Sequence, residues 1–305
     1  MTKDNININP DQPVEWFEQA KVLSEALPYM RRFTGKSVVI KYGGHAMVNS
    51  KLAERFARDI VLLRQVGLNP IVVHGGGPQI ESMLDRLHIK SEFVDGLRIT
   101  SQATMDVVEM VLSGSINKEI VSKINHAGGY AVGLSGKDGG LMLADRLQRN
   151  KRDPKTNIEA PVSFGLVGKP KSVNPHLLSA LAESDITPVI APIGIGPDGE
   201  TLNINADTVA GAIATAVNAT RLFMLTDVTG VLDQNGKLIP AMTLDEAEAL
   251  IDDGTIQGGM IPKIENCIDV VRQGVDAATI VDGRLPHAVL VELFTNGGAG
   301  TQITR

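Results

Sequence analysis

Cysteine, tryptophan and long apolar runs are almost missing from this sequence of 305 residues. The single cysteine, Cys267, cannot form a disulfide within the chain, which is typical of a reducing compartment. No apolar run approaches the ~20 residues that a membrane-spanning helix needs. The opening segment MTKDNININP lacks the basic and apolar parts of a signal peptide. We therefore expect a cytoplasmic protein with no membrane segment.

An excess of positive charge is also missing. Lys and Arg number 29 against 35 Asp and Glu, which gives a formal charge of −6 and a pI near 5.6. A protein that neutralises nucleic-acid phosphates carries the opposite balance, so we expect no nucleic-acid partner. Hydrophobic residues make up 43% of the chain, enough for a sizeable core in one large α/β unit or in two lobes.

Two common phosphate-binding motifs are absent, although fragments resemble them. GIGPDG at 194–199 matches the dinucleotide fingerprint by letter, but that motif works only where a helix follows. Here PDG indicates a turn, and TLNINAD after it alternates like a strand. TGKS at 34–37 resembles the end of a P-loop, but Met30 stands where the opening glycine belongs. Any phosphate must bind by another route.

Short apolar runs rich in β-branched residues alternate with amphipathic segments along most of the chain. This alternation predicts an α/β fold with a mainly parallel sheet covered by helices on both faces. The expected strands span 37–42, 69–74, 130–136, 186–194, 221–228 and, as the final core strand, 278–283. The expected helices span 52–67, 78–87, 101–126, 208–219, 243–252 and 261–274. The polar segment 146–172 is expected to be a solvated hairpin or loop.

A further helix is expected ahead of the first strand. Residues 13–33 carry apolar side chains at helical spacing, Trp16 and Phe17 among them. Pro28 should kink or break this helix. The minimal fold does not need the segment, so residues 1–33 are interpreted as an N-terminal helical extension, whose aromatic side chains favour a partner surface over packing on its own lobe.

Glycine gathers where the expected strands end. Those ends read KYGG, HGGG, GLSGKDGG, TDVTG and VDG. Open parallel sheets bind their ligands beyond these carboxyl ends. In IVVHGGGPQI, at 71–80, three glycines follow a stiff apolar strand. Either a turn or the close approach of a ligand to the backbone would explain them.

Two lysines in these segments point to anion chemistry. Lys41 ends a strand just before Gly43 and Gly44, whose bare backbone N–H groups could bind an anion. Lys263 follows Pro262 in the first turn of an expected helix, where a cation opposes the helix dipole. Each lysine alone also fits an ordinary surface position.

TLNINAD and VDGLRIT supply further polar candidates. In TLNINAD, the side chains of Thr201, Asn203, Asn205 and Asp207 would share one face of a strand. Polar side chains that bind partners inside the fold and an exposed edge strand explain this pattern about equally well. Arg98 in VDGLRIT could be a surface residue, or it could hold a carboxylate through two parallel hydrogen bonds.

The combined set favours phosphoryl transfer. It contains two lysines, an aspartate able to hold both, and no obvious nucleophile–base pair. Phosphoryl transfer depends mainly on positioning and on charge stabilisation. A carboxylate acceptor is already ionised at pH 7 and needs no general base, so the pattern suits a carboxylate kinase better than a hydroxyl kinase.

Six segments then occur in a characteristic order: VIKYGG, VVHGGGPQI, DGLRIT, LNINAD, LTDVTGVL and GGMIPK. In order and spacing they resemble the N-acetylglutamate kinases of the amino acid kinase family, from about residue 35 to the end. The resemblance implies a three-layer αβα sandwich of two lobes, with acetylglutamate bound by 34–215 and the nucleotide by 216–305. It implies phosphorylation of N-acetyl-L-glutamate by ATP to N-acetyl-L-glutamyl 5-phosphate in arginine biosynthesis, with Mg²⁺ carried by the ATP and no separate metal site.

The resemblance also implies residue roles. Lys41 and Lys263 would stabilise transition-state charge, and Asp207 would hold them in place. Backbone N–H groups for phosphate would come from Gly43, Gly44 and Gly75. The acetylated amino acid would be bound by Gly76, Gly77, Arg98 and Asn203.

The N-terminal helix resembles that of arginine-inhibited relatives in which dimers join into a ring-shaped hexamer. L-Arginine, as feedback inhibitor, would then bind between this helix and the segment LVELFTNGGAGTQI. The residues implied there are Tyr29, His287, Glu292 and Gly298.

Other functions stay open on the sequence. A carbamate, aspartate or glutamate kinase of the same fold is the nearest alternative, although the order of DGLRIT and LNINAD favours the acetylglutamate member. A nucleotide-binding regulator without catalysis is a second alternative, and the presence of both lysines and Asp207 argues against it.

Overall fold

One sheet of eight strands runs through the molecule. The computed structural model describes residues 13–47, 49–94, 96–152, 159–295 and 297–305. The strand order is β12-β14-β13-β11-β1-β2-β8-β5, and every neighbouring pair is parallel except β13 and β14. The strands are β1 (Ser37–Tyr42), β2 (Asn69–His74), β5 (Ala131–Ser135), β8 (Thr187–Ala191), β11 (Arg221–Thr226), β12 (Ala241–Thr243), β13 (Ala277–Asp282) and β14 (Gly300–Thr304).

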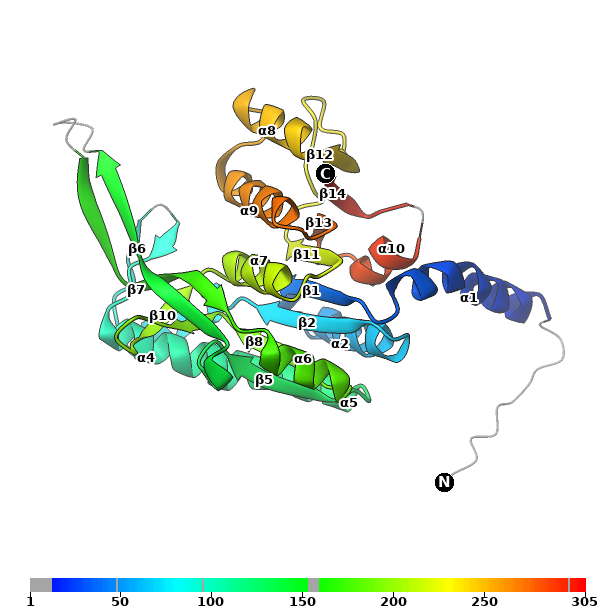
Figure 1. The fold of residues 1–305 in the computed structure, drawn as a ribbon, viewed down its shortest axis with the longest axis horizontal. Helices are drawn as coiled ribbons and strands as arrows, with labels where there is room; N and C mark the ends of the chain where they lie inside the picture. The colour runs from blue at the N-terminus through cyan, green and yellow to red at the C-terminus, as the bar shows by residue number, and fades with distance from the viewer. Residues whose placement is uncertain (1–12, 48, 95, 153–158, 296) are drawn as a thin grey trace.

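Helices cover both faces of this sheet (Figure 1). They are α1 (Pro13–Phe33), α2 (Ser50–Gln65), α3 (Gly77–Arg86), α4 (Gln102–Glu109), α5 (Asn117–His126), α6 (His176–Glu183), α7 (Ala206–Ala216), α8 (Leu244–Asp252), α9 (Ile261–Arg272) and α10 (Ala288–Phe294). Successive side chains of β1 point to opposite faces of the sheet, so the strand contributes to two separate cores. Val38 and Ile40 pack into one core with Phe56 of α2, whereas Val39 packs into a second core with Ile264 of α9. The predicted three-layer αβα sandwich is confirmed.

A smaller group of strands stands at one side of the sheet. β6 (Met142–Arg152) and β7 (Glu159–Val173) form a long antiparallel hairpin, which confirms the hairpin prediction for this segment. β9 (Ile193–Ile195) and β10 (Thr201–Ile204) close a small barrel with it, and β3 (Phe93–Val94) pairs with β4 (Leu97–Arg98). GIGPDG forms the turn between antiparallel β9 and β10, so its rejection as a dinucleotide motif is confirmed.

Several boundaries differ from the sequence prediction. Helix α1 continues through Pro28, so the predicted break is wrong. Most of the helix surface is exposed, and water can therefore bond the carbonyl that loses its N–H partner. Segment 101–126 is helical as predicted, but its middle, Met110–Ile116, is a π-helix. Segment 278–283 is not the last strand, because the short β14 follows it and β12 joins on β14.

Figure 1 shows that α1 and the β6–β7 hairpin extend from opposite sides of the body. Within the described residues, no helix is long and apolar enough to cross a membrane. The one cysteine, Cys267, is buried in α9, as expected for a small apolar side chain. The parallel strands end at a common edge, and the glycine-rich segments after β1 and β2 meet there.

Candidate active site

Two lysines meet on one aspartate at the carboxyl edge of the sheet. Lys41 is the penultimate residue of β1, and its Nζ lies 3.0 Å from Oδ1 of Asp207. Lys263 lies in the first turn of α9, and its Nζ lies 2.5 Å from Oδ2 of the same carboxylate. The side chains are 12%, 24% and 14% exposed for Lys41, Lys263 and Asp207, so the charges are largely withdrawn from water but still reachable.

The start of helix α7 places this aspartate. Asn205 caps the helix, and its Oδ1 accepts hydrogen bonds from the N–H groups of Asp207 at 2.8 Å and Thr208 at 3.4 Å. Asp207 therefore lies in the first helical turn, and the prediction that it shares a strand face with Thr201 and Asn203 is wrong. The strand-like alternation of buried and partly exposed residues stops at Ile204, where β10 ends. Asn205, predicted only as one of four polar residues on a strand face, also lines the pocket.

Helix α9 approaches α7 closely because Gly211 has no side chain. A Cβ at Gly211 would lie 2.6 Å from Oδ1 of Asn266. Nδ2 of Asn266 in turn donates to the carbonyl of Asp207 at 2.9 Å. The two helix starts are thus tied together on either side of the lysine–aspartate contact.

Opposing influences act on the pKa of Asp207. Burial alone would raise the pKa, but the positive charges of Lys41 and Lys263 and their hydrogen bonds outweigh it, so that the pKa lies below its usual range. The carboxylate is therefore ionised at neutral pH. Two cations held by one anion leave a net positive site, which suits an anionic ligand.

The glycine loops surround the same site. The pocket holds about 240 Å³ and is lined by Lys41, Gly43, Gly44, Met47, Gly75, Gly76, Gly77, Pro78, Gln79, Asn205, Ala206, Asp207 and Lys263. All five glycines singled out from KYGG and HGGG are among these residues, together with both lysines and the aspartate. The structure thus brings together residues that are far apart in the sequence.

Three of the five glycines have a steric reason within the protein, namely Gly43, Gly44 and Gly76. A Cβ at Gly43 would lie 2.8 Å from Nζ of Lys41, so its absence lets the lysine fold back over the loop. Gly44 has φ +68°, and a Cβ there would lie 2.4 Å from Asp227. A Cβ at Gly76 would meet Ile116 at 2.5 Å and Leu112 at 2.7 Å. At Gly77 a Cβ would meet no protein atom within 4 Å, so this side of the loop is open.

Arg98 and Asn203 lie together, but outside the lining of the glycine pocket. Nδ2 of Asn203 is 3.4 Å from Oγ1 of Thr100, and that hydroxyl donates to the carbonyl of Arg98 at 3.0 Å. Arg98 is buried, forms an ion pair with Glu81 of α3, and stacks over the ring of Phe93 at 4.5 Å. Glu81 was not singled out from the sequence. Its helix is the one that HGGG begins, so the arginine is tied to the glycine loop through that helix.

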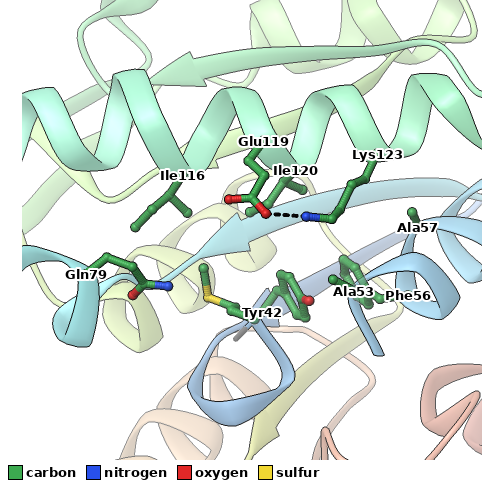
Figure 2. Close-up of a pocket in the computed structure, with 10 residues that line it drawn as sticks. Tyr42, Ala53, Phe56, Ala57, Gln79, Ile116, Glu119, Ile120 and Lys123 are labelled. Atoms are coloured by element: carbon green, nitrogen blue, oxygen red, sulfur yellow. Dashed lines mark hydrogen bonds and ion pairs between the residues drawn. The ribbon is translucent and has the colours of Figure 1, made fainter. Parts of the chain in front are cut away.

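A second pocket adjoins the first and shares Met47 and Gln79 with it (Figure 2). The ring of Tyr42 stacks on Phe56 at 3.9 Å between centroids, and burial raises the pKa of the tyrosine. Glu119 and Lys123 of α5 form an ion pair in the same lining (Figure 2). The stacked rings of Tyr42 and Phe56 lie at the end of β1.

The residues implied in arginine binding lie around α10. Oε1 of Glu292 accepts hydrogen bonds from the N–H groups of Ala299 at 2.5 Å and Gly300 at 2.8 Å, beside Gly298. His287 lies at the start of α10, with Nδ1 2.6 Å from Oδ1 of Asp59 on α2. Tyr29 lies in α1, which contacts α10. The carboxylate of Glu292 thus already holds a loop backbone.

The chain is similar to known proteins over most of its length. The sequence profile of the Amino acid kinase family matches residues 36–282. An acetylglutamate kinase of Rhodospirillum centenum is 64% identical over 291 residues, which cover 95% of each chain. Another acetylglutamate kinase, of Rhodospirillum rubrum, is 62% identical and covers 97% of this chain and 96% of the relative.

Solved structures share the fold at low identity. A carbamate kinase of Giardia lamblia bound to AMP-PNP superposes with a TM-score of 0.63 at 18% identity, over 88% of this chain and 98% of the other. The N-acetylglutamate synthase of Neisseria gonorrhoeae complexed with coenzyme A and N-acetyl-glutamate gives 0.78 at 20% identity, over 94% of this chain and 63% of the other. Sequence and fold agree, and the chain belongs to the amino acid kinase family, within its acetylglutamate kinases.

Proposed function

We propose that this chain transfers the γ-phosphoryl group of ATP to the side-chain carboxylate of N-acetyl-L-glutamate at the glycine pocket, with Lys41 and Lys263 as its catalytic residues and Asp207 as the residue that positions them. The main support for this proposal is that two lysines contact one largely buried aspartate in a pocket lined by five glycines. Relatives at 58–64% identity are named acetylglutamate kinases, which gives the acceptor and its place in arginine biosynthesis.

The chemistry suits this geometry. The acceptor carboxylate is ionised at pH 7, so the site needs no general base. The transferring phosphoryl group spreads negative charge over its equatorial oxygens, and fixed cations stabilise that charge. Lys41 and Lys263 are held on opposite oxygens of Asp207, so each ammonium is positioned before the reaction begins. Asp207 holds the lysines and does not touch the reacting atoms.

The glycine loops would provide the backbone contacts. We assign phosphate binding to the N–H groups of Gly43, Gly44 and Gly75, and substrate contact to Gly76 and Gly77. Neutral N–H donors can be directed at the position that charge occupies only in the transition state, which raises kcat and not merely affinity. The open side of Gly77 supports this, because a ligand there would touch only backbone.

Arg98 and Asn203 would bind the acetylated amino acid. The guanidinium of Arg98 is braced by Glu81, Ser91 and Phe93, so little side-chain entropy is lost when it binds a carboxylate. Asn203 lies beside it through Thr100. We place acetylglutamate against the part of the chain before residue 216, and the nucleotide against 216–305. The proposed boundary falls at the end of α7.

Mg²⁺ would arrive as part of the MgATP substrate. Within the part of the chain that the structure describes, no group of three or more His, Cys, Asp or Glu side chains could hold a metal ion. Phosphate oxygens and water molecules would supply most of the ligands of the ion. We assign no residue of this chain as a resident metal ligand.

Feedback control is the last part of the proposal. Helix α1 exposes Trp16, Leu23 and Leu27, which suits pairing with its copy in a neighbouring dimer and a hexameric ring. L-Arginine would bind between α1 and α10, near Tyr29, His287, Glu292 and Gly298. It would inhibit by favouring one ring geometry, which requires different affinities for two states.

The proposed reaction is tested by trapping its product. With MgATP, N-acetyl-L-glutamate and hydroxylamine, the acyl phosphate should be captured as a hydroxamate while ADP is released. Carbamate, aspartate and free glutamate serve as comparison acceptors. Hydroxamate or ADP formed faster with one of these acceptors than with acetylglutamate would contradict the assignment.

A further inference from the structure

His74 is a fully buried polar residue that directly precedes the glycine loop. It is the last residue of β2, and its Nδ1 lies 2.8 Å from the carbonyl oxygen of Gly75. Its Nε2 lies 3.2 Å from Nδ2 of Asn117, which is also fully buried. Asn117 begins α5 and donates to the carbonyl of Val189 at 2.9 Å, so the contact joins the loop to the sheet.

These contacts settle which ring nitrogen carries the proton. A carbonyl oxygen only accepts, so Nδ1 of His74 must donate to Gly75. In the neutral ring, Nε2 then carries the lone pair and accepts from the amide of Asn117. Oδ1 of Asn117 accepts from Nζ of Lys118 at 3.2 Å, which fixes the amide orientation as well. Burial lowers the pKa of His74 to about 4, consistent with a neutral ring.

The hydrogen bond that His74 donates to the carbonyl of Gly75 has a consequence for the pocket. In a trans peptide the C=O and the N–H of one unit point in opposite directions. The carbonyl of Gly75 is turned toward the buried His74, so the N–H of Gly76 in the same unit is turned away from it. Gly76 lines the pocket. A hydrogen bond to the carbonyl also polarises the unit and strengthens its N–H as a donor.

The π-helical segment packs against Gly76 of the same peptide. Leu112 and Ile116 fill the space beside Gly76, as the clashes of a Cβ there show. Asn117 follows directly after this segment. π-Helical turns often mark functional sites. This one supplies the two side chains that fill the space, and Asn117, the next residue, forms the hydrogen bond with His74.

We propose that His74, held in its Nδ1–H tautomer by Asn117, is a positioning residue that directs the Gly76 N–H into the glycine pocket. The inference rests on the proposed role of the glycine loop in phosphoryl transfer. His74 acts through the backbone and touches neither substrate, which separates it from the lysines. Its loss should therefore change turnover more than affinity.

Two substitutions separate the functions of the two ring nitrogens. His74→Asn places an amide N–H where Nδ1 stands and keeps the donor to Gly75, but does not reach Asn117. His74→Gln reaches Asn117 but removes the donor from the Nδ1 position. We expect His74→Gln to lower kcat about 100-fold and His74→Asn less than about 10-fold, with either KM changed less than about 3-fold. Unfolding midpoints in urea show whether the two variants lose similar stability.

A spectroscopic measurement provides a second test. In ¹⁵N-histidine-labelled protein, the His74 signal is identified by its loss in His74→Gln, and its two ring shifts should show the Nδ1–H tautomer unchanged from pH 8 to pH 5. An Nε2–H tautomer, or titration near pH 6.5, would overturn the inference. So would equal kcat losses in the two variants, or losses that follow their unfolding midpoints. If instead the unmodified protein forms no hydroxamate with MgATP and acetylglutamate, the proposed function itself has failed.

Discussion

Nζ of Lys263 lies 2.5 Å from Oδ2 of Asp207, a contact between the first turns of two helices that are 56 residues apart in the sequence. A cation at a helix start opposes the helix dipole, and the carboxylate offsets this cost. The same carboxylate lies 3.0 Å from Lys41, so it holds two like charges close together. A ligand anion is the remaining partner that both ammonium groups can share.

Loss of either lysine should reduce turnover strongly. We expect Lys41→Ala and Lys263→Ala each to lower kcat about 10²–10³-fold, the range for removal of one preorganised donor. Asp207→Asn keeps the shape but leaves two cations without their anion, so both kcat and the free energy of unfolding should fall, the latter by about 3 kcal/mol. Steady-state kinetics and urea unfolding measure these effects. Near-normal kcat in a lysine variant would remove that lysine from the catalytic set.

Arg98 should control affinity for the acceptor. Arg98→Lys keeps the charge but loses the planar fork, so KM for acetylglutamate should rise about 10–100-fold while KM for ATP stays within about 2-fold. Glu81→Gln, which removes the charge that braces Arg98, should give a smaller rise with the same selectivity. A larger rise in KM for ATP than for acetylglutamate would move Arg98 to the nucleotide side.

Gly76 and Gly77 form a matched pair. Gly76→Ala forces a methyl group against buried Leu112 and Ile116, which should destabilise the protein by about 1–3 kcal/mol. Gly77→Ala meets no protein atom within 4 Å and should fold normally, yet turnover should fall because a ligand needs that space. Thermal unfolding and kcat are compared for both. Full activity in Gly77→Ala would show that no reacting group comes close to this residue.

His74 should make stability depend on pH in a defined range. Its pKa is lowered to about 4 by burial, and a histidine in the unfolded chain has a pKa near 6.5. Between these values the unfolded chain binds more protons, so stability falls as the pH drops from ~6.5 to ~4, by roughly 3 kcal/mol. The groups that face His74 are Lys118 on α5 and Tyr42, its partner in β1. Burial raises the pKa of Tyr42, so this tyrosine keeps its proton in that range.

The comparison that isolates His74 is the unfolding free energy of the unmodified protein minus that of His74→Gln. This difference should be constant above pH 7 and should shrink toward pH 4, because the variant lacks the titrating ring. Aspartates such as Asp59 and Asp207 titrate equally in both proteins and cancel. A difference that does not change with pH would contradict the assignment of His74 as a buried neutral ring.

The exposed face of α1 should control assembly. Trp16, Leu23 and Leu27 are 43%, 66% and 45% exposed, and their combined replacement by Ser should reduce the particle mass measured by light scattering and the response to L-arginine, with kcat retained. Leu62→Ser, on the exposed side of α2, is the matched control and should change neither. A hexamer that remains fully arginine-sensitive would exclude this role for α1. Deletion is a poorer test if it includes Phe33, because Phe33 is buried in the core.

Much of the fold and part of the site could be predicted from the sequence. β1 and β2 were predicted residue for residue, since buried parallel strands are apolar runs that end abruptly in glycine. Parallel strands share a carboxyl edge, so KYGG and HGGG had to meet. Asp207 was wrongly predicted to lie on a strand. The alternation of polar and apolar residues in TLNINAD fits a strand, but Asn205 in the same segment also fits the cap of a helix, which it forms in the structure.

The positioning residues could not be predicted. His74 and Asn117 are 43 residues apart, and a single buried polar contact leaves no periodic pattern in the sequence. The π-helical segment Met110–Ile116 has only seven residues within a longer helical pattern, too few for its wider turn to be distinguished in the sequence. β12 has only three residues, and β14, GTQIT, contains one large apolar side chain, so neither gives an apolar run in the sequence.

The order of strands in the sheet also has a consequence for synthesis. β1 pairs with β2 on one side and with β11 on the other, and β11 follows β2 by ~150 residues. At ~5–20 residues per second, the nascent chain therefore carries one bare edge of β1 for roughly 8–30 s. That edge belongs to SVVIKY, an apolar β-branched strand of the kind that pairs readily with other chains. Until β11 leaves the ribosome, the strand that covers this edge of β1 in the folded protein is missing.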